Sequence, residues 1–415
     1  MTDQAISSVT NAALSLLIAR FVDARTFAAY AVSFTLYSLF VGGMRALVSE
    51  PLAVRFSSCG RAEYRDVARA AVGGALMLGA GAGMLLVLVG ASLGHDIGGT
   101  MIVLGLFLPA LLAQDAWRAV FIVHGRPASA ALNDSAWATV QLGVVGWMLY
   151  VGVDTAPPLL AGWGSAAVVA ALLGVAQMRV YPQPVRGVRW LARQADLSRF
   201  YLPQFLAVVG SFQVTLLLVG VVGSLQDVGS LRAALVLLGP LGIIGFSAMA
   251  FAVPELSRRN LNRRRTLQAA IAISSVLVLA SVLWSAVLLA LPDRLGSQLL
   301  GDTWRDARAV LPGMVVWQLA TVAVCGASAA ITAKGWARAS FRISAILAPA
   351  FLLFGLVGTR LAGASGAAAG MALAQWVMVP VYWTLLVTRT AGAMRSPRHA
   401  PGSSPEIAHR VADTA

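Results

Sequence analysis

Charged residues in long apolar stretches are the part of this sequence that could do chemistry. Asp115 and Arg118 lie three positions apart in Gln114–Asp115–Ala116–Trp117–Arg118, so on a helix they share one face and can neutralise each other. A charge at the centre of a bilayer costs on the order of 2.5–3.5 kcal/mol, so each one needs a partner or a function. Two interpretations stay open: a structural ion pair, or a proton- or ion-coupled carboxylate beside a cation that meets an anionic ligand.

A second acid and two further arginines belong to the same group of candidates. Asp134 follows Asn133 close to the inner interface, where it could couple to an ion, cap a helix or anchor a loop. Arg45 could pair with Glu50, extend to the inner headgroups, or face a cavity. Arg20 lies near the outer end of the first apolar run, on the side of the helix opposite its polar residues.

Polar residues recur at helical spacing in two of the apolar runs. Because a helix turns about 100° per residue, each set forms one polar stripe along its helix. The first stripe consists of Gln4, Ser8, Asn11 and Ser15. The second, 200 positions later, consists of Gln204, Ser211 and Thr215. The stripes could face a cavity or bond neighbouring helices. The first interpretation makes Gln4, Asn11, Gln204 and Ser211 candidates for substrate binding.

These residues belong to a chain with the composition of a membrane protein. Of its 415 residues, 58% are hydrophobic and 12% are charged, and a soluble protein carries roughly twice that charged share. The apolar residues come in blocks long enough to cross a hydrocarbon core about 30 Å thick. A transmembrane barrel would instead show alternating segments of about ten residues. We therefore expect an all-α polytopic membrane protein with twelve transmembrane helices.

The expected spans follow the apolar blocks. The first six are 5–22, 27–48, 70–92, 100–123, 130–153 and 159–178. The second six are 201–223, 233–253, 267–291, 309–332, 343–359 and 362–388.

The basic residues predict the orientation of the spans. With the N-terminus inside, the inner segments hold 23 Lys and Arg and the outer ends hold 7, as expected when positive residues stay on the cytoplasmic side. Both termini would then be cytoplasmic in a multi-pass protein of the cell membrane. The net charge of +14 lies in short loops rather than on one face, which argues against nucleic-acid binding.

The longest inner loop, from Arg179 to Phe200, divides the chain into six spans and six spans. We expect an N-terminal six-helix lobe at 1–180, a cytoplasmic basic linker at 181–200, a C-terminal six-helix lobe at 201–390 and a disordered cytoplasmic tail at 391–415. The linker would be a short helix on the anionic inner leaflet or a solvated connection. Two lobes of equal topology can form a V with a cavity between them.

Three stretches resemble a known family. They are Asp3–Asn11 followed by Ala19–Arg20, Gly43–Leu52, and Gln114–Arg118 continuing through Gly125–Arg126–Pro127 to Asn133–Asp134. They are similar to bacterial polysaccharide (O-antigen type) flippases of the multidrug/oligosaccharidyl-lipid/polysaccharide exporter superfamily. The twelve-span organisation covers nearly the whole chain, and the local motifs lie mostly in the N-terminal half.

The resemblance implies a function and a site. The function is movement of a polyprenyl-pyrophosphate-linked oligosaccharide from the inner to the outer leaflet, by alternating access, for cell-surface polysaccharide biosynthesis. The pyrophosphate would meet Arg45 and Arg118, with Arg20 behind them. No arginine falls deep inside the predicted spans of the second half, so this binding would be one-sided. The implied partners are the lipid-linked sugar, membrane lipids, and a glycan polymerase or glycosyltransferases.

Two other functions remain open. A cation-coupled multidrug exporter of the same superfamily would prefer an acid-rich, aromatic cavity, and a non-transporting membrane scaffold of a glycan assembly complex would need no charged cavity. The 4 histidines are dispersed and no Walker-type loop is present. We therefore expect no metal site, no cofactor and no enzymatic activity.

Overall fold

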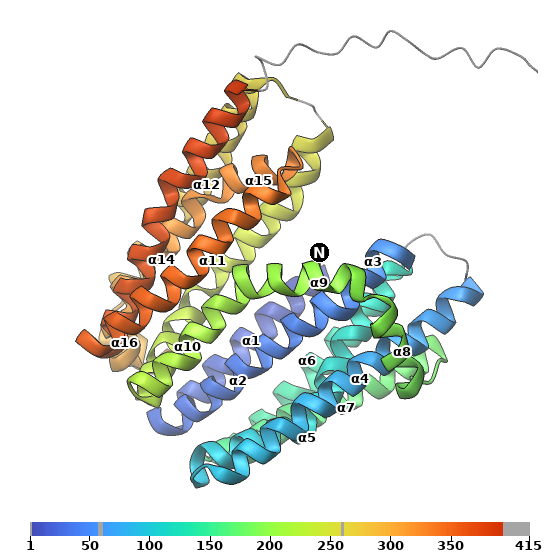
Figure 1. Ribbon diagram of the computed structural model, residues 1–415. Coiled ribbons are helices and arrows are strands. Elements are labelled where there is room, and N and C mark those ends of the chain that lie inside the picture. The colour runs from blue at the N-terminus through green and yellow to red at the C-terminus, as the bar shows by residue number, and fades with distance from the viewer. Residues whose placement is uncertain (1, 57–60, 259–260, 393–415) are drawn as a thin grey trace, which may run out of the picture.

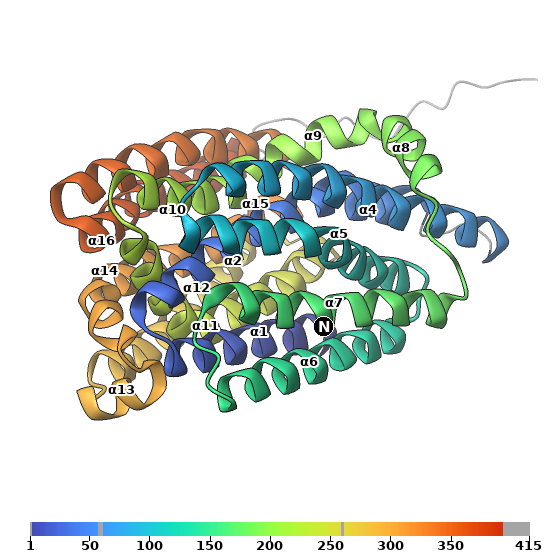
Figure 2. The ribbon, with the colours of Figure 1, turned by 90° about the horizontal axis from the view of Figure 1, so that it is seen from below.

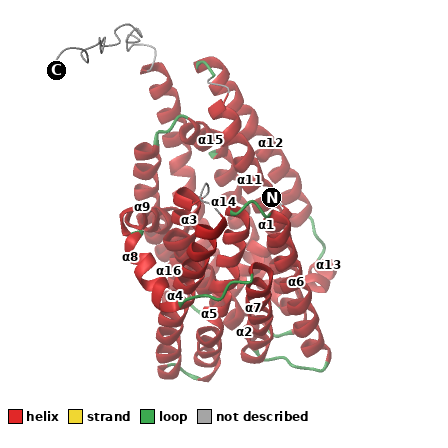
Figure 3. Ribbon diagram, turned by 90° about the vertical axis from the view of Figure 1, so that its right-hand side faces the viewer, coloured by secondary structure: helices red, strands yellow, loops and turns green. Residues whose placement is uncertain are grey.

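The computed structural model describes residues 2–56, 61–258 and 261–392. Within these ranges every regular element is helical, and most of the helices are joined by short loops (Figure 3). The expectation of an all-α chain is confirmed.

The first half of the chain consists of helices in the following order. They are α1 (Thr2–Phe21), α2 (Ala24–Met44), the π-helical turn η1 (Arg45–Ser49), α3 (Glu50–Phe56), α4 (Arg61–Ser92), α5 (His95–Val123), α6 (Pro127–Tyr150) and α7 (Ala156–Met178). Local chemistry sets their ends. Asp23 accepts a hydrogen bond from the Thr26 amide and caps α2. Gly125, at φ 72°, ends the turn after α5, and Pro127 opens α6.

Two shorter helices connect to the second half. They are α8 (Pro184–Arg193) and α9 (Ala195–Phe205), and α9 continues through the π-helical turn η2 (Leu206–Gly210) into α10 (Ser211–Val222). The remaining helices are α11 (Leu225–Arg258), α12 (Arg263–Leu289), α13 (Asp293–Leu300), α14 (Thr303–Ala323), α15 (Cys325–Ala333) and α16 (Ala337–Gly392).

The basic linker expected at 181–200 is therefore largely helical. Figure 2 shows α8 at the edge of the molecule beside α4. Gly187 permits this contact, because a Cβ there would lie 2.2 Å from the backbone nitrogen of Gly74. The Gln183 amide also donates to the Arg69 carbonyl at 2.9 Å. Placement of this helix on the inner leaflet stays a prediction.

Figure 1 shows α4 to α7 on one side of the molecule and α11 to α16 on the other, with α1, α2 and α10 between them. The helices of the first half (α1 to α7) and those of the second half (α10 to α16), which we call the two groups of helices, contact each other at the end where α1 stops, which we call the α13 end. There a Cβ on Gly229 of α11 would lie 3.0 Å from the Ala28 Cβ of α2, and one on Gly301 would lie 2.8 Å from the Arg20 carbonyl oxygen. The opposite end, where α3 lies, we call the α3 end.

The last helix, α16, reverses direction and supplies two antiparallel arms. The backbone leaves helical geometry at Ala362 and Gly363, and Gly363 takes φ 57°. Asp227 of α11 accepts a hydrogen bond from the Ala364 amide at 2.7 Å and so holds the reversal. Gly358 then lies against the carbonyl of Gly366, because a Cβ on it would be 2.0 Å from that oxygen.

Eight helices of the described residues are long and apolar enough to cross a membrane. Each of the twelve predicted spans coincides with helical backbone, but α16 is counted once although it contains the last two. The count of twelve and the lobe boundaries therefore stay predictions. The predicted tail begins at residue 391, and from residue 393 it lies outside the described residues.

The close approach inside α16 can be tested by adding one methyl group. We expect Gly358→Ala to lower the thermal unfolding temperature in detergent, because overpacking costs about 1–3 kcal/mol. The matched control is Gly143→Ala on α6, since a Cβ at Gly143 meets no atom within 4 Å. Equal unfolding temperatures for the two variants would contradict the tight reversal.

Candidate functional site

A cavity of about 730 Å³ lies between the first-half helices and the α9–η2 segment, towards the α3 end. Its polar and charged lining comes from α1, α2, η1, α3, α5 and α9. These residues are Asn11, Tyr37, Ser38, Arg45, Ser49, Glu50, Asp115, Arg118, Tyr201 and Gln204. The cavity therefore collects polar groups that are widely separated in sequence.

A local change from α-helix to π-helix orients the Arg45 side chain. It is the first residue of η1, where the Glu50 amide bonds to the Arg45 carbonyl, five residues back. Pro51 follows immediately and can donate no amide hydrogen, and its ring crowds the carbonyl four residues earlier. A π-turn accommodates such a disruption and commonly occurs at functional sites.

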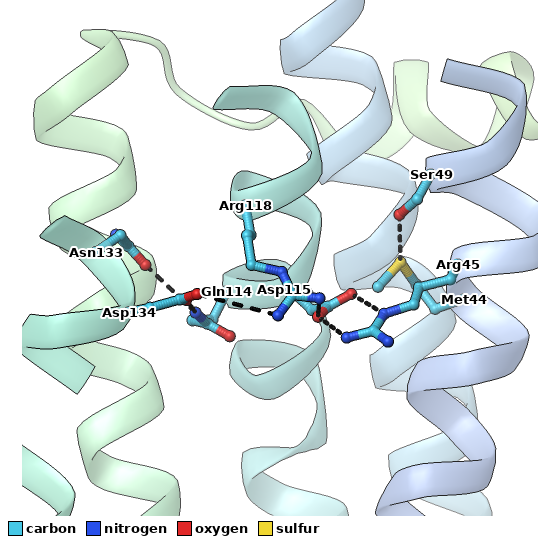
Figure 4. Close-up of polar contacts among 8 residues, drawn as sticks. All are labelled: Met44, Arg45, Ser49, Gln114, Asp115, Arg118, Asn133 and Asp134. Carbon is cyan, nitrogen blue, oxygen red and sulfur yellow. Dashed lines mark hydrogen bonds and ion pairs between the residues drawn. The ribbon is translucent and has the colours of Figure 1, made fainter. Parts of the chain in front are cut away.

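The Arg45 guanidinium is held by Asp115 of α5 rather than by Glu50. Nε of Arg45 donates to Oδ2 of Asp115 at 2.8 Å, and Nη2 donates to Oδ1 at 2.5 Å (Figure 4). This is a bidentate pair, the strong form of an arginine–carboxylate contact. Arg45 keeps 38% of its side chain exposed, whereas Asp115 keeps 5%, so the arginine is the member that faces the cavity.

Arg118 continues the same row of charges into the protein. Its Nη2 lies 3.1 Å from Oδ1 of Asp115, as the spacing of three residues predicts. Its Nη1 lies 4.0 Å from Oδ2 of Asp134 on α6. Gln114 donates to the other oxygen of Asp134 at 2.8 Å. Four charges of alternating sign thus run from the cavity inwards: Arg45, Asp115, Arg118 and Asp134, which we call the charge ladder.

The structure brings five of the predicted site residues to the cavity wall, namely Asn11, Arg45, Asp115, Arg118 and Gln204. Asp134 lies behind them, and its side chain is fully buried. Gln4 is on α1, but its side chain lies outside the described residues.

Ser211 is placed elsewhere. Its side chain is buried and donates to the Ala207 carbonyl of its own helix at 3.1 Å. Thr215 and Ser15 likewise donate to carbonyls four residues earlier. Serine and threonine hydroxyls inside helices often donate to the carbonyl four residues earlier. Several side chains of the two polar stripes are thus hydrogen-bonded to the backbone of their own helix.

Arg20 is at the α13 end, away from the charge ladder. Its Nη1 donates to the Ser297 carbonyl near the C-terminus of α13 at 2.8 Å, a position that favours a cation. It lines a separate cavity of about 640 Å³ with Asp293, Arg305 and Arg308. There, hydrogen bonds from Trp304 and Arg308 hold the pKa of Asp293 below its usual range. Arg20 thus links the two groups of helices where they meet.

One arginine of the second half lies closer to the cavity than the sequence predicts. Arg232 directly precedes the predicted span 233–253, but it lies on α11, the eighth residue of a helix that begins at Leu225. Its guanidinium carbon stands 4.6 Å from the ring centroid of Phe34, and Nη2 donates weakly to the Ser38 hydroxyl at 3.4 Å. Phe34 and Ser38 both line the cavity, so a cation of the second half adjoins its wall.

Aromatic residues complete the wall. Tyr37 packs edge-on against Trp163 with centroids 4.8 Å apart. Phe205 lies across Gly42, since a Cβ there would be 2.2 Å from its ring. Over the part of the chain that is described, no group of three or more His, Cys, Asp or Glu could hold a metal ion.

Comparison with known proteins identifies the fold. No protein-family model matches the chain, and no curated protein matches it. A multidrug resistance MATE family transporter of the MOP superfamily, in an inward-facing conformation, superposes with a TM-score of 0.74 at 13% identity, over 94% of this chain and 96% of that one. The lipid II flippase MurJ, inward closed, gives a TM-score of 0.70 at 11% identity, over 95% and 90% of the two chains.

An outward-facing conformation of a MATE family transporter superposes less well, with a TM-score of 0.61 at 12% identity over 95% of this chain and 94% of that one. At such identities the likeness concerns the fold. The chain therefore has the fold of MOP superfamily transporters, and its long apolar helices make it a multi-pass membrane protein.

The cavity can be tested by thiol labelling. With Cys59 and Cys325 replaced by serine, we expect Gln204→Cys to react with a water-soluble thiol reagent roughly tenfold faster than Ser211→Cys, because exposure controls access to the thiol. Gln204 is exposed and lines the cavity, whereas Ser211 is buried two turns further along. Equal rates would contradict this placement.

Proposed function

We propose that this protein is a flippase that moves a polyprenyl-pyrophosphate-linked oligosaccharide from the inner to the outer leaflet for cell-surface polysaccharide biosynthesis. The observation that carries the proposal is the placement of Arg45 and Arg118 on one wall of the cavity. Guanidinium groups bind phosphate oxygens through two parallel hydrogen bonds, and they do so best where water is scarce.

The size and lining of the cavity support the same substrate. A volume of about 730 Å³ falls within the range of about 300–1,000 Å³ that is usual for ligand sites. Gln204, Ser49 and Tyr201 supply neutral polar groups beside the arginines, as a sugar would require. The polyprenyl chain would stay in the bilayer while the headgroup enters from the α3 end.

In a carrier that works by alternating access, the substrate enters from the end at which the cavity is accessible. The two groups of helices approach closely at the α13 end, through Gly229 with Ala28 and through Arg20 with Ser297, while the cavity lies towards the α3 end. The better superposition on an inward-facing than on an outward-facing transporter supports the same state. With both termini in the cytoplasm, as the basic residues predict, the cavity would open inwards to receive the lipid.

A cation-coupled multidrug exporter is the second candidate, favoured by a specific feature of the wall. Glu50 is exposed there, and Phe34, Tyr37, Tyr201 and Phe205 supply aromatic surface, which suits an organic cation. The two arginines count against a cation at the same place. A non-transporting scaffold would need no such cavity, so we rank it third.

The experiment is complementation of a flippase-deficient strain. We expect Arg45→Gln and Arg118→Gln to abolish surface polysaccharide, because each removes a guanidinium from the headgroup site, while both variants still reach the membrane. Arg294→Gln is the control, since Arg294 is exposed on α13 and outside the cavity.

Full activity of both cavity variants would overturn the site. Failure of the unmodified protein to restore polysaccharide, together with export of a cationic dye, would favour the multidrug exporter. Surface polysaccharide restored equally by all variants would favour the scaffold.

A further inference from the structure

The charge ladder leaves the arginines of the cavity already neutralised. Arg45 and Arg118 carry two positive charges, and Asp115 and Asp134 carry two negative charges, so the row sums to zero. An anion that enters the cavity therefore meets guanidinium groups whose charge is compensated by the protein. Binding of a pyrophosphate must therefore change the contacts between these guanidinium groups and Asp115, which is paired with both of them.

We propose that Asp115 is the resident counter-ion of the empty cavity, occupying the guanidinium groups that the phosphate of the substrate binds, and leaving them when the substrate arrives. This inference rests on the proposed function and deepens it. Asp115 then holds the cavity in a neutral state between substrates and sets the affinity for the headgroup.

The geometry at Arg45 supports an exchange. Asp115 accepts hydrogen bonds from Nε and Nη2 of Arg45, and these two atoms form one edge of the guanidinium group. A phosphate can bind such an edge through two parallel hydrogen bonds as well. The two hydrogen bonds to Asp115 use two of the five donors of Arg45. A phosphate can first bind the remaining donors from the cavity, where Arg45 is 38% exposed, and then replace the carboxylate at the occupied edge.

The geometry at Arg118 shows why Asp115 can leave. One carboxylate serves two guanidinium groups, because Oδ1 contacts both Arg45 and Arg118. Arg118 has a second acid within 4.0 Å, Asp134, which is buried and bonded to Gln114. When Asp115 moves away, Arg118 keeps Asp134, and Arg45 is left for the incoming anion.

The exchange also accounts for the return of the empty carrier. After release of a pyrophosphate, the Arg45 guanidinium would remain without a counter-ion in a cavity that must close, and uncompensated charge inside a bilayer is strongly unfavourable. Rebinding of Asp115 removes that obstacle. The resident carboxylate thus weakens substrate binding and permits turnover.

Binding to the purified protein in nanodiscs tests the inference. The probe is farnesyl pyrophosphate, with farnesol as the control that lacks the phosphates, and the measurement is isothermal titration calorimetry. We expect Asp115→Asn to bind the probe at least about tenfold more tightly than the unmodified protein, because it adds one net positive charge beside the site. Asp115→Glu keeps the counter-ion and should bind as the unmodified protein does.

Asp134→Asn is the matched control. It makes the same change of charge, but its side chain is fully buried and contacts only Arg118 among the arginines of the ladder. We expect it to tighten binding clearly less than Asp115→Asn. If Asp115→Asn does not fold, as judged by its unfolding temperature, Asp115→Ser also removes the carboxylate and replaces it with a smaller neutral side chain.

The kinetics of flipping distinguish a counter-ion from a residue that only stabilises the fold. In proteoliposomes, Asp115→Asn should lower both the KM and the kcat of flipping, because headgroup release and the return of the empty carrier become slower. A folded Asp115→Asn or Asp115→Ser protein that binds the probe equally or more weakly overturns the counter-ion inference, and so does a raised KM. If neither the unmodified protein nor any variant binds the probe, the proposed function fails with it.

Discussion

Compensation of charge inside a membrane protein is the constraint on which this structure depends. Asp115 contacts two arginines at once, and with Asp134 it links η1, α5 and α6 through one row of charges. None of these side chains could remain ionised at this depth alone. The row therefore stabilises the packing of three elements and, at its exposed end, presents Arg45 to the cavity.

The cavity lies towards the α3 end because the helices meet at the α13 end. Small residues bring α2 and α11 together at Ala28 and Gly229, and Arg20 caps the C-terminus of α13 from α1. Arg232 adjoins the wall from the second half, over the face of Phe34. The cationic surroundings of the cavity are thus less one-sided than the sequence predicts, and the two groups of helices share them.

The sequence predicts the local part of this site and the class of the fold. Hydropathy locates the apolar helices, and helical spacing pairs Asp115 with Arg118 because that contact is between neighbours on one helix. It does not identify Asp115 as the partner of Arg45, since the two lie 70 positions apart and Glu50 is closer in sequence. Nor does it predict the π-turn that begins at Arg45, which depends on how the helix accommodates Pro51.

Three side chains lie elsewhere than the sequence alone indicates. Arg232 directly precedes the predicted span 233–253, whereas α11 extends back to Leu225, so its polar first turns belong to the helix. The family resemblance groups Arg20 with the cavity, and helical spacing groups Ser211 with it. Only tertiary packing decides whether such a side chain faces a cavity, its own backbone or a neighbouring helix.

The most direct measurement of the central claim is flipping itself. A fluorescent polyprenyl-pyrophosphate oligosaccharide would be reconstituted with the purified protein, and the fraction that an impermeant reductant bleaches would be followed with time. We expect this fraction to rise well above that of protein-free vesicles, and a labelled phosphatidylcholine in the same vesicles to show no rise. Bleaching of the pyrophosphate lipid no greater than in protein-free vesicles would contradict a flippase function.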